Sequence, residues 1–339
     1  ARLGLKEGDT FTITLSSEIP DIYFDTAGTL HWKAVDGAVG YRVKISDGVN
    51  TAVDECLENN SSNYAMLLAL NGFEDGTYEI EIYSVDIDGN EVLVGTIDYE
   101  YTVTSAVVGE NIFVYDINNG EATITGASIN NPDVIIPSEI DGYPVTEIGM
   151  MAFVFNWTME TVVIPEGVKK LGWYAFNSCW NLREVTLPES LEYIDSWAFE
   201  RCTSLETIHI PANVTTVMGG AFAQNDSMTS ITCDEKNNNY VSVNGVLFTK
   251  DVKAIVAYPG GINGEYTVPA TVSRIGDAAF YGAKGLTAVN ILGTLDFIGF
   301  EGFAECELLT DVTINEGVDY IGYWAFRNCR GIKILTVPQ

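Results

Sequence analysis

The chain contains few side chains of the kinds that act in metal binding or nucleophilic catalysis. Histidine occurs only at His31 and His209, and the six cysteines include no pair with the CxxC spacing of a zinc site or redox motif. Neither a glycine-rich phosphate loop nor a nucleophile elbow is present. We therefore expect no metal site, no cofactor and no catalytic residue.

Four cysteines nevertheless share a fixed place in a repeating pattern. Cys179, Cys202, Cys306 and Cys329 each lie three residues after a recurring phenylalanine. Stacked strands lie about 4.8 Å apart, so neighbouring cysteines of this column could approach disulfide distance. The same slot holds Asn156, Asn225 and Ala283 in other repeats, which favours a small buried residue over redox or metal chemistry.

One acidic segment imitates a calcium site. Asp86, Asp88 and Asn90 have the spacing of the start of a calcium-binding loop. An EF-hand also needs glycine at its sixth position and glutamate at its twelfth. Here Gly89 falls at the fourth position and Ile97 at the twelfth, which favours a plain turn between two strands.

Aromatic side chains are the strongest candidates for a binding site. Four of the six tryptophans fall between residues 157 and 197. The candidate aromatic surface comprises Trp157, Trp180, Trp173, Tyr174, Trp197, Tyr323 and Trp324. Exposed aromatic clusters commonly mark binding surfaces because they give a large contact area at a small entropy cost. The alternative is ordinary packing against neighbouring turns or against the N-terminal domain.

Length and charge narrow the function classes. The chain has 339 residues, with 47 acidic and 17 basic side chains and a formal net charge of −30. Such a surface repels phosphate backbones and anionic membranes, so we expect no nucleic-acid partner. No apolar run approaches the ~18 residues of a membrane span, so we expect no membrane insertion. The chain begins at Ala1 rather than methionine, and we expect an extracellular or cell-surface protein whose signal peptide has been removed.

The elements that must position these residues follow from an internal repeat. Phenylalanine preceded by alanine, or once by glycine, recurs at spacings of 23, 23, 23, 58, 23 and 23 residues. Its positions are Phe153, Phe176, Phe199, Phe222, Phe280, Phe303 and Phe326. Apolar residues recur five and eight positions before it and six positions after it. One unit cannot bury its apolar face alone, whereas stacked units can, so the repeat predicts a solenoid over residues 112–339.

Each unit opens with a short alternating segment that is often closed by proline, as in VVIP at 162–165. Period-two alternation is typical of a short strand with two side chains inward and one outward, and proline ends it. We expect these strands to form a parallel ladder and to be joined by short helical turns, which makes the fold mainly β. The outward residues Thr186, His209, Asn290 and Thr313 form a candidate exposed strand face.

One repeat is longer than the others by 35 residues. The extra residues, about 234–265, contain Asn244-Gly245 between alternating apolar residues, which is the strongest short signal for a β-hairpin. We expect this hairpin to lie in or beside the stack. A second hairpin, turning at 118–120, is expected to cap the exposed first edge of the solenoid.

The unit from Ile164 to Val185, IPEGVKKLGWYAFNSCWNLREV, resembles the bacterial BspA-like leucine-rich repeat. That family repeats Ile-Pro, then Val, Ile-Gly and Ala-Phe, then Cys and Leu. The stretch VIIPSEIDGYPVTEIGMMAF resembles its usual first repeat, and YVSVNGVLFTKD resembles its irregular long repeat. The departures, which affect single turns, are Leu292 and Asn315 in place of proline and Met218 in place of glycine.

Residues 1–105 lack the repeat and carry short alternating runs separated by turns, which predicts a β-sandwich of about seven strands. The runs are Thr10–Leu15, Leu30–Lys33, Tyr41–Ile45, Tyr78–Ser84 and Val92–Val103. The segments TLHWKAVDGAVGYRVKI and GTYEIEIYSVDIDGNE resemble a fibronectin type III module with Trp32 as its buried aromatic, and an immunoglobulin-like sandwich is the alternative. We expect a short linker, residues 106–111, between sandwich and solenoid.

These observations lead to three functional hypotheses. The BspA-like resemblance implies a non-catalytic, secreted or cell-surface bacterial protein that adheres to host or neighbouring-cell proteins through its solenoid. The fibronectin-like module would act as a spacer or second contact. A carbohydrate-binding module, with aromatic faces stacking on sugar rings, and a structural spacer are the alternatives. The partner would be a protein or a glycan, and we expect a monomer.

Overall fold

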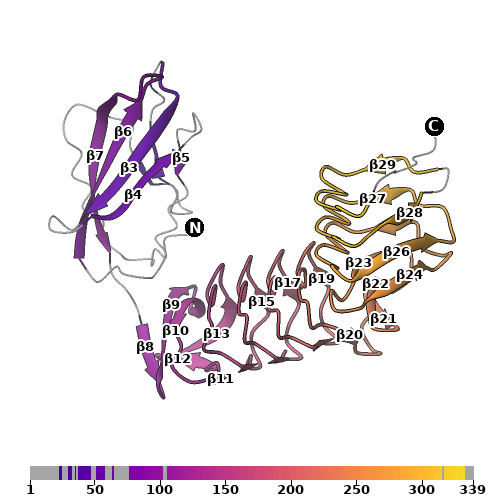
Figure 1. Cartoon of the computed structure of the whole chain (residues 1–339). Helices are drawn as coiled ribbons and strands as arrows, with labels where there is room; N and C mark the ends of the chain where they lie inside the picture. The colour runs from indigo at the N-terminus through magenta and orange to yellow at the C-terminus, as the bar shows by residue number, and fades with distance from the viewer. Residues whose placement is uncertain are drawn as a thin grey trace. The chain divides into compact units, whose positions relative to one another are not determined.

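The computed structural model describes residues 23–24, 30–32, 35, 37–46, 51–57, 63–64, 76–101, 105–314 and 317–332. The chain divides into two compact units, one of residues 1–105 and 114–118 and the other of residues 106–113 and 119–339. Within the described ranges every regular element is a β-strand (Figure 1). None of these residues belongs to a helix long and apolar enough to cross a membrane.

The first unit contains two antiparallel sheets. Their strands are β1 (Tyr23–Phe24), β2 (Leu30–His31), β3 (Gly40–Ser46), β4 (Thr51–Leu57), β5 (Asn63–Tyr64), β6 (Gly76–Val85) and β7 (Glu91–Tyr101). The four-stranded sheet has the order β4-β3-β6-β7 and the three-stranded sheet has the order β1-β2-β5. Strands β3, β6 and β7 confirm three of the predicted runs, and the run Thr10–Leu15 lies outside the described residues.

Strand alternation builds the core of this unit. In β3, Tyr41, Val43 and Ile45 are buried, while the residues between them are partly exposed. The indole of Trp32 is also buried and meets the ring of Tyr41 edge-on, with 5.3 Å between the ring centroids. Two antiparallel sheets and a buried Trp32 are what the predicted sandwich requires. The more specific fibronectin type III assignment stays a prediction.

A three-stranded cap closes the first edge of the solenoid. It contains β8 (Ser105–Val108), β9 (Asn111–Asn118) and β10 (Glu121–Ser128), and β10 pairs in parallel with the first coil. The predicted turn between β9 and β10 is confirmed, because Asn119 and Gly120 have φ values of 52° and 80°, as a tight hairpin requires. Residues 114–118 of β9 fall in the first compact unit. We nevertheless describe β9 with the solenoid, because it pairs with β8 and β10 in one sheet.

The predicted linker at 106–111 is wrong. Ser105 already begins strand β8, and Asn111 begins β9 after a turn at Gly109. The side chain of Asn111 is buried, and its carboxamide oxygen accepts hydrogen bonds from the backbone N–H groups of Asn130 and Asn131 at 3.0 and 3.3 Å. These bonds fix the segment to the solenoid, whereas a linker would be solvated.

Each coil of the solenoid contributes two short strands to parallel ladders. The first strands are β11 (Asp133–Ile135), β14 (Thr161–Val163), β16 (Glu184–Thr186), β18 (Thr207–Ile210), β20 (Ser230–Cys233), β24 (Gly264–Val268), β26 (Leu286–Ile291) and β28 (Asp311–Thr313). The second strands are β13 (Tyr143–Ile148), β15 (Lys170–Leu171), β17 (Tyr193–Ile194), β19 (Thr216–Val217), β25 (Arg274–Ile275), β27 (Phe297–Ile298) and β29 (Tyr320–Ile321). A short strand β12 (Glu139–Ile140) pairs with β13. The sequence predicted the first strands and missed the second.

The recurring phenylalanines form a continuous stack at the centre of the coils. Phe153 and Phe176 have ring centroids 4.9 Å apart and planes only 3° from parallel, and Phe176 and Phe199 follow at 5.1 Å. On the first side, Phe113 of β9 meets Phe153 edge-on at 6.4 Å. A repeat of fixed length therefore keeps one large ring above another, as the pattern predicted.

The turns that carry the Ala-Phe pair are not helical, so the expected short helical turns are wrong. Residues two before and two after each phenylalanine have positive φ. They are Met151, Phe155, Tyr174, Ser178, Trp197, Arg201, Gly220, Gln224, Ala278, Gly282, Glu301, Glu305, Trp324 and Asn328. A left-handed residue interrupts the right-handed helical path, so consecutive tight turns form in its place.

These turns form a third ladder between coils. In most coils the N–H groups two before, at and two after the phenylalanine donate to carbonyls of the next coil. In one coil, Tyr174, Phe176 and Ser178 donate to the carbonyls of Ser196, Ala198 and Glu200 at 3.3, 2.8 and 2.8 Å. The bonds satisfy backbone groups that would otherwise be buried without partners.

The insert folds as the predicted hairpin. Strands β21 (Tyr240–Val243) and β22 (Val246–Thr249) pair around a turn at Asn244-Gly245, and β23 (Ala254–Ala257) follows β22 and joins the second ladder. Tyr258 then takes the place of the core phenylalanine, because its ring stacks on Phe280 at 4.6 Å. Its N–H donates to the carbonyl of Ala279 at 2.8 Å, as the phenylalanines do in other coils.

The insert adds strands on one side of the stack but no turn on the opposite side. The second-strand ladder is interrupted between β19 and the β21–β23 hairpin. On the turn side, by contrast, Gln224 donates directly to the carbonyl of Tyr281 at 3.2 Å, so the coils of Phe222 and Phe280 touch there. The direction of stacking consequently changes at the insert, with the turns on the inner side (Figure 1).

Tyr258 gives a test of this packing. Its hydroxyl is buried and finds no hydrogen-bond partner among the described residues. Because such a group costs free energy, we expect Tyr258→Phe to raise the free energy of unfolding by up to about 1 kcal/mol. Tyr258→Ala should lower it by about 3–5 kcal/mol, because the ring fills the core.

Urea denaturation of the three proteins measures both effects. Loss of stability in Tyr258→Phe would show that the hydroxyl has a partner in solution and would contradict the packing described here.

Candidate functional site

The turn ladder determines which side chains reach the surface. The phenylalanine and the residue before it are buried in almost every coil, whereas the residue three before the phenylalanine is partly or largely exposed in every coil. The residue two after it is exposed at Phe155 and buried at Ser178 and Gln224. Trp173 and Trp324, for example, are partly to largely exposed, with 39% and 60% of their surface accessible. The outward columns are thus free to carry binding groups.

A continuous row of aromatic rings follows this edge. We name it the turn platform: Trp173, Tyr174, Trp197, Tyr281, Phe300 and Trp324. Ring centroids lie 4.4 Å apart for Trp173 and Tyr174, 6.5 Å for Tyr174 and Trp197, and 5.2 Å for Trp197 and Tyr281. Phe300 and Trp324 are 5.7 Å apart. The row spans both sides of the insert.

Arg327 joins the two parts of the turn platform. Its guanidinium lies 5.9 Å from the ring of Tyr281 and 5.3 Å from that of Trp324. It also donates to the Tyr281 hydroxyl at 3.0 Å and forms an ion pair with Glu301 at 2.8 Å. A cation between two aromatic faces is attracted to both, so the rings are held in place.

Trp197 rests on a glycine. A Cβ atom added at Gly220 would come within 2.4–2.7 Å of the indole carbons of Trp197, and Gly220 has φ +74°. The indole of Trp197 therefore requires glycine at this position, whereas the turn alone does not, because Tyr174 and Ala278 adopt the same positive φ in other coils.

Two carboxylates lie beneath the platform. Glu200 is 8% exposed and Glu301 is 5% exposed. Burial raises the pKa of both carboxyl groups, while Arg201 opposes the shift at Glu200 and Arg327 opposes it at Glu301. Glu200 also accepts a hydrogen bond from the side chain of Asn177 at 2.7 Å.

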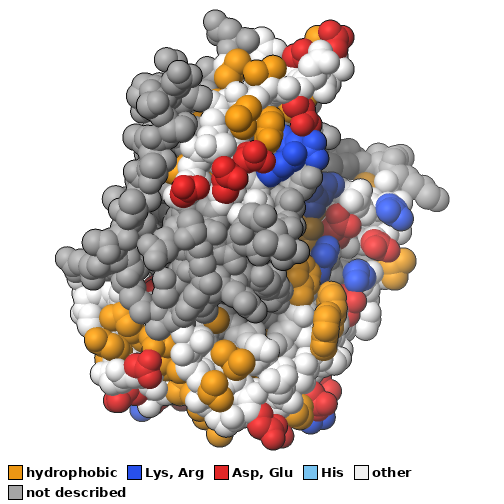
Figure 2. Space-filling model, turned by 90° about the vertical axis from the view of Figure 1, so that its left-hand side faces the viewer, with side chains coloured by type: hydrophobic (Ala, Val, Ile, Leu, Met, Phe, Trp, Pro, Cys, Tyr) orange, Lys and Arg blue, Asp and Glu red, His pale blue; other side chains and the backbone are white. Residues whose placement is uncertain are grey.

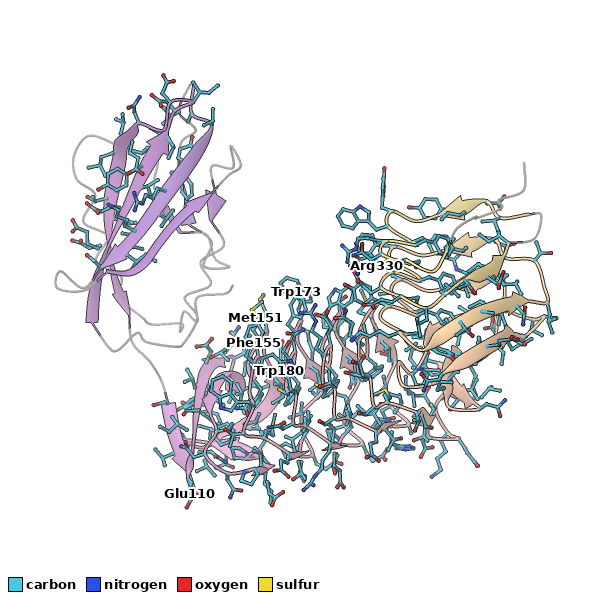
Figure 3. The ribbon with its side chains drawn as sticks, in the orientation of Figure 1. Glu110, Met151, Phe155, Trp173, Trp180 and Arg330 are labelled. Carbon is cyan, nitrogen blue, oxygen red and sulfur yellow. The ribbon has the colours of Figure 1, made fainter. Side chains whose placement is uncertain are left out.

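A separate aromatic group lies on the first two coils. Phe155, Trp157 and Trp180 are exposed to 56%, 67% and 42%, and we name this group the tryptophan patch. The rings of Phe155 and Trp180 are 6.2 Å apart, and Figure 3 shows them side by side. Trp157 and Trp180 lie four residues after the phenylalanine, outside the columns of the turn platform.

The predicted aromatic surface thus splits into two groups, and Tyr323, which is 80% exposed, borders the turn platform next to Trp324. Sequence reasoning missed Tyr281, Phe300 and Phe155. Phe300 lies three residues before its phenylalanine, Tyr281 one residue after it and Phe155 two residues after it. The two positions after the phenylalanine are buried in several other coils, so the repeat alone does not mark these rings as exposed.

The residues of the predicted strand face lie in three sheets. Thr186 lies in β16 of the sheet β11-β14-β16, His209 lies in β18 of the sheet β18-β20, and Asn290, which pairs with Thr267, lies in β26 of the sheet β24-β26-β28. His209 is exposed, and its Nδ1 lies 2.9 Å from the hydroxyl oxygen of Thr232. Thr313 pairs with Asn290, and its side chain lies outside the described residues.

The cysteine column has a structural role. Cys179, Cys202, Cys306 and Cys329 are free thiols, and each donates to the carbonyl of the preceding coil's phenylalanine at 2.9–3.1 Å. Burial raises the pKa of the Cys202 thiol well above its usual range. These contacts explain why a small donor recurs three residues after the ring.

The Asp86 segment is a closed turn. Asp86 accepts hydrogen bonds from the backbone N–H groups of Asp88 and Asn90 and from the Asn90 side chain, at 2.8–2.9 Å. The Asn90 side chain is the largest cause of the lowered pKa of this carboxyl. Across the described residues, no group of three or more potential ligands is arranged to hold a metal ion.

Charge is dispersed over the molecule. Figure 2 shows acidic side chains scattered among hydrophobic and uncharged ones on the face that it presents. Several basic groups pair with acidic ones across coils, as Lys170 does with Glu147 and Arg183 with Glu160, at 2.9 and 2.8 Å. The net charge of −30 therefore does not mark one site.

Gly220→Ala tests the contact between Gly220 and the indole of Trp197. The added Cβ would strike the indole and the backbone would be strained, so we expect a loss of about 1–3 kcal/mol in unfolding free energy and a changed near-UV circular dichroism signal. Gly142→Ala is the control, since Gly142 also has positive φ, at +84°, but its Cβ would meet nothing within 4 Å. An unchanged aromatic signal in Gly220→Ala would contradict the described contact.

Glu200→Gln tests the buried carboxylate. Because the pKa of Glu200 is raised in the folded state, the wild-type protein should lose stability as the pH rises through that pKa. The Glu200→Gln variant does not lose stability in this way. The difference in unfolding free energy, variant minus wild type, should therefore be more positive at neutral pH than in mild acid. Urea denaturation at both pH values, with the exposed Glu206→Gln as control, measures the difference. Identical pH profiles for the two variants would contradict the assignment.

Several solved bacterial proteins match part of the chain. The T. pallidum leucine rich repeat protein is 22% identical, covering 65% of this chain and 87% of its own, with a TM-score of 0.41. Pneumococcal vaccine antigen PcpA is 18% identical over 63% and 71%, with a TM-score of 0.46. A leucine rich cell surface protein from Faecalibacterium prausnitzii is 22% identical over 68% and 88%, with a TM-score of 0.31.

Comparison with sequence families shows to which family the chain belongs. No curated protein matches the chain significantly. The BspA type leucine rich repeat region matches in six copies, over residues 142–252 and 263–339. These ranges contain the stacked phenylalanines from Phe153 to Phe326 and the turns that carry both aromatic groups. The chain belongs to the BspA type leucine rich repeat family.

Proposed function

We propose that this chain is a non-catalytic, secreted or cell-surface bacterial adhesion protein that recognises a protein partner through the turn platform. The single observation that carries the proposal is the continuous row of aromatic rings held together by Arg327 along the turn edge. Membership of a bacterial leucine rich repeat family and similarity to a protein described as a leucine rich cell surface protein support the location.

The composition of the platform supports a protein partner. Energetic centres of protein interfaces are enriched in tryptophan, tyrosine and arginine, and lysine is depleted. The turn platform and its border contain Trp173, Trp197, Trp324, Tyr281 and Arg327. Charged groups next to the rings, such as Glu305 and Arg330, would supply orientation.

Rigidity also supports binding at this surface. The backbone beneath each ring is fixed by the ladder that includes the bond from Glu301 to Tyr323 and that from Phe303 to Ala325, at 3.0 and 2.8 Å. Binding then costs little conformational entropy, because the partner meets rings that are already positioned.

The buried carboxylates fit a supporting role better than a catalytic one. Glu301 is engaged by Arg327 and Glu200 by Asn177. A catalytic pair would be expected to face a substrate with free oxygen atoms and to be accompanied by a shaped cleft. The platform instead offers an extended surface of rings.

Trp324→Ala tests the proposal. Wild-type protein would be screened by surface plasmon resonance against purified host extracellular-matrix and cell-surface proteins. We expect at least one specific partner and a loss of affinity of about tenfold or more, which corresponds to ~1.4 kcal/mol, when the Trp324 ring is removed.

Trp157→Ala is the matched control, because Trp157 is also an exposed tryptophan but lies outside the turn platform. Equal loss of affinity in both variants would exclude the turn platform as the specific contact. Absence of any partner would favour a structural spacer.

A further inference from the structure

We propose that the tryptophan patch, formed by Phe155, Trp157 and Trp180, is a second and separate binding site, and that it binds a neutral glycan. The patch lies two and four residues after the core phenylalanine on the first two coils. The turn platform uses other columns and is centred on later coils. The proposal therefore does not depend on the protein partner proposed above.

The patch presents aromatic faces to solvent. Each of its three rings is more than 40% exposed, although a large apolar side chain gains free energy by burial. Phe155 and Trp180 are tilted by 49° to each other at 6.2 Å, so the pair forms a bent surface rather than a tight stack. The apolar C–H face of a pyranose ring packs well against such aromatic faces.

The backbone holds this surface open. Phe155 has a φ of +57°, a left-handed conformation that is rare for a bulky residue. Its N–H donates to the carbonyl of Asn177 at 2.9 Å, and the side chain of Asn181 donates to the carbonyl of Trp157 at 2.6 Å. The rings therefore stay exposed because the turns on which they sit are fixed by the neighbouring coil.

The turn segments that carry the rings are polar but uncharged. Positions two to five after the phenylalanine in these coils hold Phe155 to Thr158 and Ser178 to Asn181, without an acidic or basic residue. This is unusual in a chain of net charge −30. The nearest charged residues that follow, Glu160 and Arg183, form an ion pair with each other at 2.8 Å.

This chemistry favours a neutral sugar over an acidic one. Hydroxyl and amide groups exchange hydrogen bonds with sugar hydroxyls, whereas a carboxylated or sulfated glycan would require an unpaired arginine or lysine. The carboxamide oxygen of Asn181 has no hydrogen-bond partner in the described part of the chain and is available as an acceptor. The turn platform, with its arginine and glutamate side chains, offers a different environment.

The spacing of the coils fits a chain of sugars. Trp157 and Trp180 occupy the same column of neighbouring coils, and neighbouring coils lie about 4.8 Å apart. That rise is close to the length of one pyranose unit along an extended glycan. A glycan lying along the solenoid axis would therefore place successive rings over the aromatic groups of successive coils.

Calorimetric titration of the whole chain tests the site. The probes are hexasaccharides of glucose, mannose, galactose, xylose and N-acetylglucosamine, with hexagalacturonate as the acidic comparison. We expect at least one neutral probe to bind and to change tryptophan fluorescence, and the affinity to be unchanged up to about 0.5 M NaCl. Hexagalacturonate should bind more weakly.

Variants distinguish the two aromatic surfaces. Trp157→Ala and Trp180→Ala should each weaken the neutral probe by about tenfold or more, Trp157→Phe should retain most of the affinity, and Trp324→Ala should leave it unchanged. Thermal melting of each variant reports whether it is folded, as expected for exposed side chains.

The proposal would be overturned by no binding of any neutral probe, by an equal loss in Trp324→Ala, or by tighter, salt-sensitive binding of hexagalacturonate. A protein partner that is lost in Trp157→Ala rather than in Trp324→Ala would also overturn it. Failure of the glycan titration would leave the protein-binding result unaffected. Failure to find a protein partner would likewise leave the glycan result unaffected.

Discussion

The structure of the solenoid depends on the backbone ladder that joins its turns. In most turns three N–H groups donate to three carbonyls of the next coil, as Phe280 does to Gly302 at 2.8 Å, whereas the turn of Phe199 makes two such bonds and that of Phe222 makes one. To place these groups along one axis, the chain alternates right- and left-handed residues and accepts positive φ at side chains as large as Trp197 and Trp324. Each such residue costs of order 1–3 kcal/mol, so the ladder and the stacked rings must offset that strain. The same turns expose some of the neighbouring side chains, and both of the proposed binding surfaces lie along them.

The insert shows how one change in repeat length alters the whole stack. Tyr258 supplies a ring and a backbone bond in the core, but the insert has no turn of its own between the coils of Phe222 and Phe280. The insert adds strands on the strand side of the stack and no turn on the turn side, so the stack bends toward the turns. The coil of Phe222 lies between those of Trp197 and Tyr281, and the two rings meet at 5.2 Å because Gly220 has no side chain to come between them.

Much of the solenoid could be predicted from the sequence because its core residues recur at a fixed interval. The phenylalanine column, the first strands, the cap and the Asn244-Gly245 hairpin all have strong local signals and were expected. The second strands were missed because two residues, such as Lys170–Leu171, are too short to show an alternating pattern. The turns were expected to be helical because positive φ at a residue such as Tyr174 has no signature when glycine is absent. Of the candidate site, the tryptophans were predictable, but Phe155, Tyr281 and Arg327 acquire meaning only from their neighbours in adjacent coils.

Two aromatic surfaces on one ladder then differ mainly in their charged neighbours. The backbone beneath Phe155 and Trp324 is the same, since each carries positive φ in a tight turn. Around Trp324, Arg327 and Glu301 form an ion pair that can orient a partner with charges of its own. The turn segments that carry Phe155 and Trp180 contain no charged residue, so a neutral ligand that offers hydroxyl groups and apolar C–H faces displaces water from no charged group of these segments. In a solenoid whose core is fixed by repetition, specificity therefore has to arise in the outward columns. The contrast in charge between these two groups is the physical reason to assign them different ligands.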